Sequence, residues 1–304
     1  MDKKKMSDLI KNTLKKSDSV ITDLKRTPGG VTNISYFVTV NGEELVVRIP
    51  GKGTIELIDR RNEKNNLIFG TKLGINPELI YFDEQSGLKI TRKIKDPTLM
   101  TPQFARERKM TKQIIALFKH LHQSKIVMKN RFELFTLIFH YENLVKKENT
   151  HIIEKLFTLK KDVLALKKVY DSFQVTEVPC HIDSGSENII LGENGKLFLI
   201  DWEYSGMFDP LWDIATFFLS VQFTEEEEMF FLQNYLKREP TNEEKQRIML
   251  HKIFQDYLWC LWSFYKEKKA DRDQKVHPDE YGAYGQYHIR RAKENINLYH
   301  RLYN

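Results

Sequence analysis

The sequence predicts an α+β protein of two lobes, with a small sheet-rich lobe ahead of a larger helical lobe. Three observations predict this class. Short apolar runs separated by turn signals fill the first third of the 304 residues, as expected of paired strands. From about residue 100 onward, apolar residues recur at helical spacing over long stretches. A segment with two prolines, 93–102, separates the two patterns, so we expect lobes at 1–94 and 95–304.

The composition is that of an ordinary soluble globular protein. Hydrophobic residues make up 41% and charged residues 30%, and no apolar run reaches the length of a membrane span. The two cysteines, Cys180 and Cys260, suggest no disulfide framework, so we expect a reducing, cytoplasmic setting without a signal peptide. The net charge of +6 is spread widely and falls in no nucleic-acid-binding motif. We therefore expect neither a nucleic-acid partner nor insertion into a membrane.

An amphipathic helix over 1–18 and a β-hairpin open the first lobe. The runs 34–40 and 44–49 flank Asn41-Gly42, a dipeptide that adopts the positive φ angles of tight hairpin turns. Just before them, the glycine pair in 29–33 lets a backbone come close to a phosphate. A plain turn explains that pair about as well, so both interpretations stay open.

A strand cation and a helix carboxylate follow the hairpin. Arg48 stands late in the second strand, and a helix expected over 54–72 carries Glu56 and Glu63. Kinase folds use such a pair to aim a positive charge at nucleotide phosphates, although a surface arginine and a surface glutamate explain the pattern equally well. Two more strands are expected at 79–82 and 88–92.

The second lobe has the pattern of a series of amphipathic helices. His120 and His122 flank Leu121 in the first of them, and we interpret both as helix-end residues because no third metal ligand with suitable spacing follows. The helices are expected at 102–125, 132–145, 150–173, 211–222, 225–237, 245–269 and 281–303.

The stretch 180–213 carries the residues that point to a chemistry. Asn188 follows Asp183 by five positions, and Asp201 comes after an apolar run. Phosphoryl transfer needs these residue types, because one carboxylate accepts a hydroxyl proton while an amide and a second carboxylate hold Mg²⁺. The turn expected at 193–195 predicts a hairpin that brings Asn188 and Asp201 to the same end.

Several motifs together resemble the choline/ethanolamine kinases, within the aminoglycoside phosphotransferase superfamily, and most of all the bacterial choline kinases of the LicA-like type. The resemblance covers nearly the whole chain and is weakest from about 100 to 170. The motifs are GGVTN at 29–33, CHID at 180–183, ENII at 187–190, LIDWEYSGMFDPLWDIA at 199–215, LWCLWSFYKE at 258–267 and YGAYG at 281–285.

The resemblance implies a protein-kinase-like fold and the transfer of the γ-phosphate of ATP, with Mg²⁺, to the hydroxyl of choline, which gives phosphocholine. In the catalytic loop it implies a base at Asp183, a structural histidine at His181, magnesium ligands at Asn188 and Asp201, and a bracing carboxylate at Asp213. For the nucleotide it implies a phosphate loop with Gly30, Thr32 and Asn33, the ion pair Arg48–Glu63, and an adenine-binding linker from Thr91 to Ile94.

Two tryptophans are candidates for the acceptor pocket. Trp259 and Trp262 are three positions apart and share one helix face, which by itself fits core packing or a ligand cage. Choline is a quaternary ammonium, which aromatic faces attract, and the resemblance places the choline pocket at these tryptophans. Tyr281 and Tyr284 are our candidates for further aromatic contacts.

The chain departs from the family pattern at two places. Ser220 stands where relatives usually carry a glutamate near the ammonium group, and Ser184-Gly185-Ser186 replaces bulkier residues in the catalytic loop. A pocket with one fewer carboxylate should bind ammonium more weakly, accept a different alcohol, or use a neighbouring acid. Ethanolamine, an aminoglycoside or another amino alcohol is therefore an alternative acceptor, and a non-catalytic nucleotide-binding role is a second alternative. The oligomeric state stays open.

Overall fold

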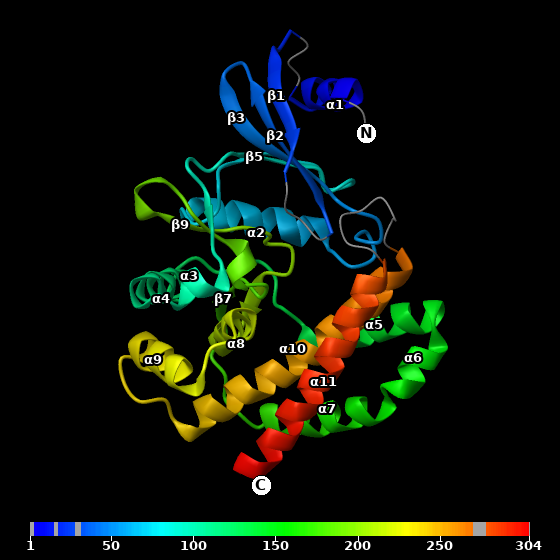
Figure 1. The fold of residues 1–304 in the computed structure, drawn as a ribbon, viewed down its shortest axis with the longest axis vertical. Helices are drawn as coiled ribbons and strands as arrows, with labels where there is room; N and C mark the ends of the chain where they lie inside the picture. The colour runs from blue at the N-terminus through cyan, green and yellow to red at the C-terminus, as the bar shows by residue number, and fades with distance from the viewer. Residues whose placement is uncertain (1–2, 15–17, 28–31, 270–277, 304) are drawn as a thin grey trace.

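The first lobe is built on one five-stranded antiparallel sheet in the order β1-β2-β3-β5-β4 (Figure 1). The computed structural model describes residues 3–14, 18–27, 32–269 and 278–303. The predicted hairpin is confirmed, because its turn residues Asn41 and Gly42 have φ angles of 52° and 83°. The strands are β1 (Ile21–Arg26), β2 (Ile34–Val40), β3 (Glu43–Ile49), β4 (Leu79–Phe82) and β5 (Lys89–Arg92).

Two helices accompany this sheet. Helix α1 (Lys3–Leu14) packs its apolar stripe against the strands, since Met6 and Ile10 are each 1% exposed and share a core with Val47. Helix α2 (Arg60–Lys72) begins six residues later than the predicted 54–72. Asp59 sets this start, because its side chain caps the first free backbone N–H groups of α2.

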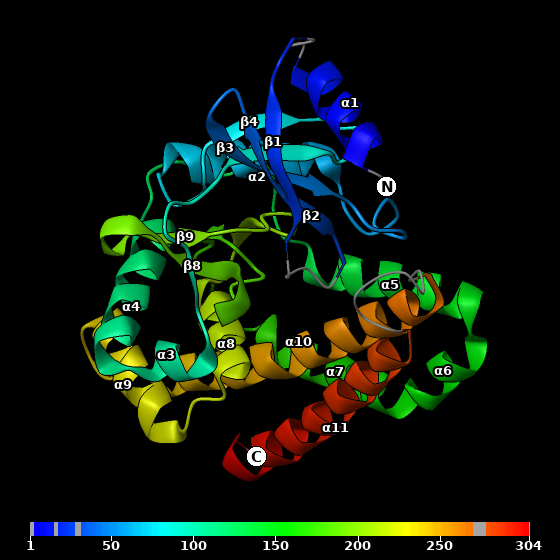
Figure 2. The ribbon, with the colours of Figure 1, turned by 45° about the horizontal axis from the view of Figure 1, so that its top comes forward.

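The second lobe is mainly helical, and its two longest helices, α10 and α11, lie side by side (Figures 1 and 2). The predicted helices at 102–125 and 150–173 are each two shorter helices, because the backbone leaves the helical region at Glu107 and a new helix begins after Leu156. The helices are α3 (Pro102–Arg106), α4 (Arg108–His122), α5 (Leu134–Glu148), α6 (Thr150–Lys155), α7 (Phe157–Tyr170), α8 (Pro210–Val221), α9 (Glu225–Leu236), α10 (Asn242–Lys269) and α11 (Pro278–Tyr303). None of the helices in the described part of the chain is long and apolar enough to cross a membrane.

Short strands hold the segments between these helices. A three-stranded sheet has the order β6-β8-β9, and a two-stranded sheet pairs β7 with β10. The predicted hairpin is confirmed as β8 and β9, where Ile189 pairs with Leu199 around a turn with Asn194 at φ 60°. The short strands are β6 (Thr98–Leu99), β7 (Val178–Cys180), β8 (Ile189–Leu191), β9 (Leu197–Leu199) and β10 (Gly206–Phe208).

Helix α2 joins the core of the second lobe. Leu67 and Phe69 pack in the same cluster as Trp202, and the Phe69 and Trp202 ring centroids are 6.1 Å apart. A Cβ added at Gly70 would lie 2.7 Å from ring atoms of Trp202, so this close approach requires a glycine. The helix that carries Glu63 is thereby fixed to the segment that follows Asp201.

Candidate active site

The buried carboxylate of Asp213 on α8 holds the backbone of the loop that follows β7. It accepts hydrogen bonds from the backbone N–H groups of His181 at 2.8 Å and Ile182 at 2.7 Å. Ile182 has a φ of 73°, which costs a β-branched residue roughly 1–3 kcal/mol unless its surroundings hold it. Trp212 adds to that support by donating its indole N–H to the Ile182 carbonyl at 2.9 Å. These bonds give Asp213 the geometry expected of a bracing residue.

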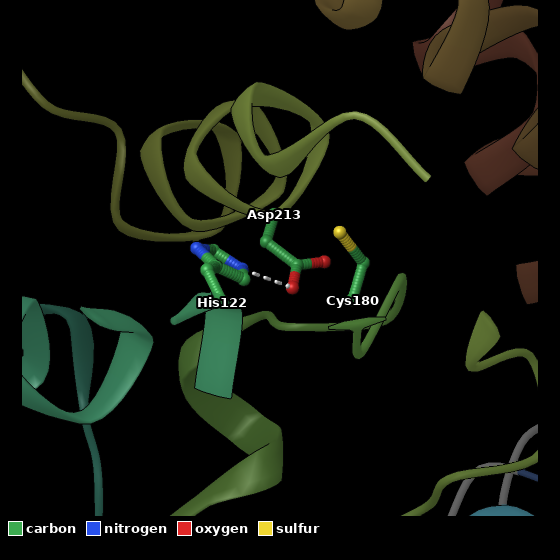
Figure 3. Close-up of side chains that lie close together, drawn as sticks. All are labelled: His122, Cys180 and Asp213. Carbon is green, nitrogen blue, oxygen red and sulfur yellow. Dashed lines mark hydrogen bonds and ion pairs between the residues drawn. The ribbon is translucent and has the colours of Figure 1, made fainter. Parts of the chain in front are cut away.

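His122 and Cys180 lie beside Asp213, with side-chain ligand atoms within 4.8 Å of one another (Figure 3). Their residue types suit a metal, but their polar atoms are already engaged. His122 hydrogen-bonds Asp213 at 3.0 Å through Nε2 and the Tyr235 hydroxyl at 2.8 Å through Nδ1. Burial raises the pKa of the Cys180 thiol well above its ordinary value, and the thiol donates to the Phe208 carbonyl. The His122 side chain therefore helps to hold Asp213 in place, and His122 is the last residue of α4, as the interpretation of a helix-end residue predicted.

His181 is fully buried and contributes packing. Its ring lies edge-on against Trp202, with centroids 4.8 Å apart. Burial lowers the pKa of His181, so the imidazole is neutral near pH 7. Its backbone carbonyl accepts a hydrogen bond from the Ser205 hydroxyl at 2.9 Å. These contacts fit the structural role that the resemblance implies.

The β8–β9 hairpin brings Asp183, Asn188 and Asp201 together. Asn188 donates its side-chain N–H to the Asp183 carboxylate at 2.9 Å and to the Asp183 carbonyl at 2.8 Å. The N–H of Ile200 bonds the Asn188 carbonyl at 3.0 Å, which places Asp201 next to Asn188. The Asn188 amide oxygen and the Asp201 carboxylate are hard oxygen ligands of the type Mg²⁺ prefers. The donor set therefore fits a magnesium ion.

The surroundings shift the pKa values of the Asp183 and Asp201 carboxylates in opposite directions. Burial, followed by the charge of Glu187, raises the pKa of Asp183 well above its ordinary value. Burial also raises the pKa of Asp201, but the charges of Arg48 and Lys89 outweigh it and hold the pKa below the ordinary value. Asp201 therefore stays ionised as a ligand must, while Asp183 is a stronger base than an exposed aspartate.

A buried ion cluster surrounds Arg48. Its guanidinium donates to Glu63 at 2.7 Å, to Glu203 at 2.7 Å and to Asp201. Arg48 is 4% exposed and Glu63 is fully buried, so the interpretation of both as surface residues is excluded. The other glutamate of the predicted helix, Glu56, is exposed and lies before α2. The arginine and the helix carboxylate thus form the pair that the sequence predicted.

Three members of this cluster escaped the sequence analysis. Lys89 faces Arg48 in the β3–β5 register and reaches to 3.6 Å from Asp201, and burial lowers its pKa. Arg60 donates to Glu63 at 2.5 Å. Glu203 stands two positions after Asp201, and that spacing is the one local signal that pointed to it.

The predicted nucleotide-binding residues are only partly brought together. Gly30 lies outside the described residues. Thr32 hydrogen-bonds the side chain of Tyr281, and the Asn33 side chain accepts from the Gly51 N–H at 3.4 Å. The segment 32–33 therefore contacts both lobes.

The segment 93–102, predicted as the link between the lobes, begins directly after β5. Thr91 lies inside β5, where it pairs with Val46 and Leu79, so the irregular segment begins at Lys93. Strand pairing on both sides fixes Thr91 in the sheet. Ile94 packs beside the β8–β9 hairpin, because a Cβ added at Gly192 would lie 2.8 Å from its side chain.

Aromatic side chains cluster around Tyr204, whose pKa is raised by burial and, among smaller causes, by the charge of Asp183. Trp259 and Trp262 on α10 have ring centroids 6.3 Å apart, and Tyr204 packs edge-on against Trp259 at 5.4 Å. The Tyr204 hydroxyl lies 3.0 Å from that of Tyr141. Both tryptophans are partly exposed, which leaves ring surface open to a ligand. The sequence analysis missed Tyr204, although it stands three positions after Asp201.

The two predicted tyrosines of α11 occupy different environments. Tyr281 is 1% exposed and packs 5.7 Å from Trp262, so it backs that tryptophan from behind. Tyr284 is 48% exposed and stacks on Tyr287 with an interplanar angle of 11°. Tyr284 therefore presents more surface to a ligand than Tyr281 does.

Ser220 supports the catalytic loop. Its hydroxyl accepts from the Ser186 N–H at 2.9 Å and donates to the Phe217 carbonyl at 3.0 Å. Ser184 donates to the Asp213 carbonyl at 2.9 Å. The Ser220 hydroxyl is thus engaged with backbone groups rather than open to a substrate, and its role as a substrate contact stays a prediction.

The two-lobed protein-kinase-like fold, in which Asp183, Asn188 and Asp201 lie together at one end of a hairpin, is that of a phosphotransferase that acts on an alcohol. The sequence model for choline/ethanolamine kinase matches residues 24–291. The chain belongs to this family.

Individual relatives agree with that assignment. The chain is 29% identical to the protein LicA of Haemophilus influenzae over 256 residues, which are 80% of this chain and 73% of that protein. It resembles the crystal structure of the choline kinase LicA from Streptococcus pneumoniae with a TM-score of 0.81 and 30% identity, covering 97% of this chain and 99% of that one. A crystal structure of LicA in complex with AMP is similar to the same degree, with a TM-score of 0.81, 29% identity and 97% and 98% coverage.

Proposed function

We propose that this chain is an ATP- and Mg²⁺-dependent kinase that phosphorylates the hydroxyl of choline to give phosphocholine. The observation that carries the proposal is the row of aromatic rings formed by Tyr204, Trp259 and Trp262. After burial and nearby tyrosine and glutamate groups, the charge of Asp183 also raises the pKa of Tyr204, so the base lies within electrostatic range of this row. A quaternary ammonium cannot donate ordinary hydrogen bonds, and aromatic faces are the surface that binds it.

In this mechanism Asp183 accepts the proton of the choline hydroxyl as the oxygen attacks the γ-phosphorus and the bond to the β-phosphate oxygen breaks. Asn188 holds the Asp183 carboxylate in place through its 2.9 Å hydrogen bond. Asn188 and Asp201 would hold Mg²⁺, which neutralises charge on the phosphates. Arg48 and Lys89 supply fixed positive charge beside Asp201. Positioning and preorganised charge, rather than covalent chemistry, carry most of this catalysis.

We assign the nucleotide to the first lobe and the junction between lobes, which we divide at about residue 94. Thr32 and Asn33 would lie near its phosphates together with Gly30, and Arg48 is oriented by Glu63. The backbone from Thr91 to Ile94, chiefly its irregular part from Lys93, would meet the base. The LicA structure that holds AMP supports nucleotide use.

Ethanolamine is the second candidate acceptor. The matching family covers both substrates, and a primary ammonium donates hydrogen bonds that the Tyr141 and Tyr204 hydroxyls can accept. An aminoglycoside carries several positive charges and is better matched by an acidic pocket than by the rings seen here. A purely nucleotide-binding role is disfavoured because Asp183, Asn188 and Asp201 are all present and lie together.

An ADP-release assay over a panel of amino alcohols tests the proposal. We expect choline to be turned over with a kcat/KM well above that of ethanolamine. Turnover of an aminoglycoside alone would overturn the choline assignment. Tight Mg-ATP binding without ADP release for any alcohol would favour the non-catalytic alternative.

We also propose that the protein works in the cytoplasm on a small amino alcohol rather than on a nucleic acid. Both cysteines, Cys180 and Cys260, are free and buried, which suits a reducing compartment. ATP is available there. Fractionation of cells that produce the protein, with immunodetection, tests the location.

A further inference from the structure

The carboxylates around the proposed acceptor pocket differ in whether a cation already neutralises them. Asp201 and Glu203 are both paired with Arg48. Asp256 on α10 is fully buried and accepts from Arg291 at 2.6 Å. These three carboxylates have no free charge to offer a substrate.

Glu187 in the catalytic loop is different. It precedes Asn188 in the short 3₁₀ turn from Ser186 to Asn188, and its side chain is exposed. Among the residues that the structure describes, no cationic side chain pairs with it. Its negative charge is therefore available to a ligand.

The loop sequence around Glu187 fixes where this carboxylate lies. The Glu187 side chain folds back over Gly185, and a Cβ added at Gly185 would collide with the carboxylate. The hydroxyl of Ser220 accepts a hydrogen bond from the N–H of Ser186 at 2.9 Å, which fixes the turn to α8. Gly185 and Ser220 lie at the two places where the chain departs from the family pattern. Together they set the position of the Glu187 carboxylate.

That position lies at the reacting end of the proposed pocket, because Glu187 directly precedes Asn188, whose side chain hydrogen-bonds the Asp183 carboxylate at 2.9 Å. The Glu187 charge also acts on the α11 side, where after burial it raises the pKa of Tyr284. Asp183 marks the end where the hydroxyl reacts, and the half-exposed ring of Tyr284 marks the α11 side. The unpaired carboxylate thus lies near the acceptor from one side while the tryptophans lie near it from another.

We propose that Glu187 supplies the countercharge for the ammonium group of the acceptor, and that Gly185 is required to place it. This assignment rests on the proposed function, because it concerns the substrate of the same site. The site then recognises a cationic alcohol by two independent means, the aromatic rings of α10 and one carboxylate from the catalytic loop. Part of the selection of a charged over an uncharged alcohol of the same shape therefore depends on the carboxylate.

The test compares choline with 3,3-dimethyl-1-butanol, an uncharged alcohol of the same shape. For Glu187→Gln we expect the KM for choline to rise roughly three- to tenfold, the size of one partly screened charge interaction. The KM for the uncharged alcohol should stay the same. Because loss of the Glu187 charge also weakens the base Asp183, any fall in kcat should be the same for the two alcohols. The matched control is Glu193→Gln, an exposed acid in the turn of the same hairpin, which should leave both KM values unchanged.

Gly185→Ala should reproduce the loss, because the methyl group displaces the Glu187 side chain. A thermal melt of each variant shows that it is folded, and the isosteric Glu187→Gln keeps the test valid if Gly185→Ala unfolds. An unchanged choline KM in Glu187→Gln, or equal increases for both alcohols, would overturn the proposal.

The outcome for the wild type separates this proposal from the proposed function. If the wild-type protein prefers another amino alcohol, the choline assignment fails, and the same comparison with that alcohol and its uncharged analogue tests Glu187. If it turns over no alcohol, calorimetric binding of choline to the wild type and to Glu187→Gln gives the answer. Equal affinities in that measurement would overturn the assignment of Glu187.

Discussion

Two regions on either side of Asp183 are built from opposite kinds of interaction. At the junction of the lobes, Arg48 is buried among Glu63, Asp201 and Glu203, and each charge has a partner. On the α10 side, the contacts are between partly exposed aromatic rings such as Tyr204 and Trp259. The first region is fully paired before any substrate arrives, whereas the second leaves ring surface open.

The difference separates the transfer chemistry from the choice of acceptor. A buried ion pair tolerates the loss of one partner poorly, because the other charge is then left without compensation. An aromatic surface binds by many weak contacts and by the ring quadrupole, so its changes are graded. We therefore expect substitutions at the junction to abolish turnover or folding, and substitutions among the rings to change the preference between alcohols.

The sharpest test of this separation is Asp183→Asn. Loss of the base should lower kcat by ~10²–10⁴, because the amide cannot accept the hydroxyl proton. The affinity for ATP should be unchanged, since Asp183 contacts the acceptor end of the site. ADP release and calorimetric ATP binding measure the two effects, and full activity in this variant would remove Asp183 from its role.

Arg48→Met breaks the junction itself. It leaves buried carboxylates without their cation, so the free energy of unfolding should fall by about 3–5 kcal/mol. Urea denaturation measures this loss. The matched control is Arg92→Met, because Arg92 pairs with Glu78 at an exposed site of the same sheet and its removal should change little. Equal losses of unfolding free energy in the two variants would show that the buried ion pairs of Arg48 contribute no more to stability than an exposed ion pair.

Trp259→Ala tests the aromatic region. Removal of one ring should raise the KM for choline about two- to thirtyfold, corresponding to ~0.5–2 kcal/mol of cation–π attraction. The KM for ATP should stay the same, because the tryptophan lies on α10, away from the charge cluster. A similar rise in both KM values would show that the two regions are not separable.

Lys266 gives the smallest expected effect, and it concerns pH. Burial lowers its pKa from 10.5 to about 8, while its ammonium donates to the Lys52 carbonyl at 2.7 Å. Between pH 8 and 10.5 the unfolded chain binds a proton that the folded chain has released, so this group makes stability rise with pH. The slope is at most about 1.4 kcal/mol per pH unit.

Lys266→Met should abolish that slope. Chemical denaturation of both proteins at pH 7.5, 8.5 and 9.5 measures it, and the difference between them isolates Lys266 from other titrating groups. If the difference in unfolding free energy between the wild type and Lys266→Met does not change with pH, Lys266 has its ordinary pKa in the folded protein.

Local signals made most of the fold predictable. The hairpin at Asn41-Gly42 and the β8–β9 hairpin depend on a few adjacent residues, and both were predicted. Strands β6, β7 and β10 have only two or three residues and pair with distant segments, so no local pattern shows them. The start of α2 was misplaced because the side chain of Asp59, which the sequence analysis did not recognise as a helix cap, sets it.

Some residues of the candidate site could also be predicted from local spacing, and others could not. Asp183, Asn188 and Asp201 stand close together in the chain, and their spacing predicted a shared site. Glu203 and Lys89 join it through contacts with Arg48 and Asp201 that span more than 100 residues. Such contacts leave no periodicity or spacing in the sequence, so only the folded structure brings them together.

Two hydrogen bonds described above cross from the first lobe to the α10–α11 pair. The side chain of Thr32, in the expected phosphate loop, hydrogen-bonds Tyr281, and the Lys266 ammonium donates to the carbonyl of Lys52. Tyr281 in turn backs Trp262. The two substrates therefore share a mechanical connection, and we expect their affinities to be coupled. By thermodynamic reciprocity, the bound acceptor changes the affinity for the nucleotide by a certain factor, and the bound nucleotide changes the affinity for the acceptor by the same factor.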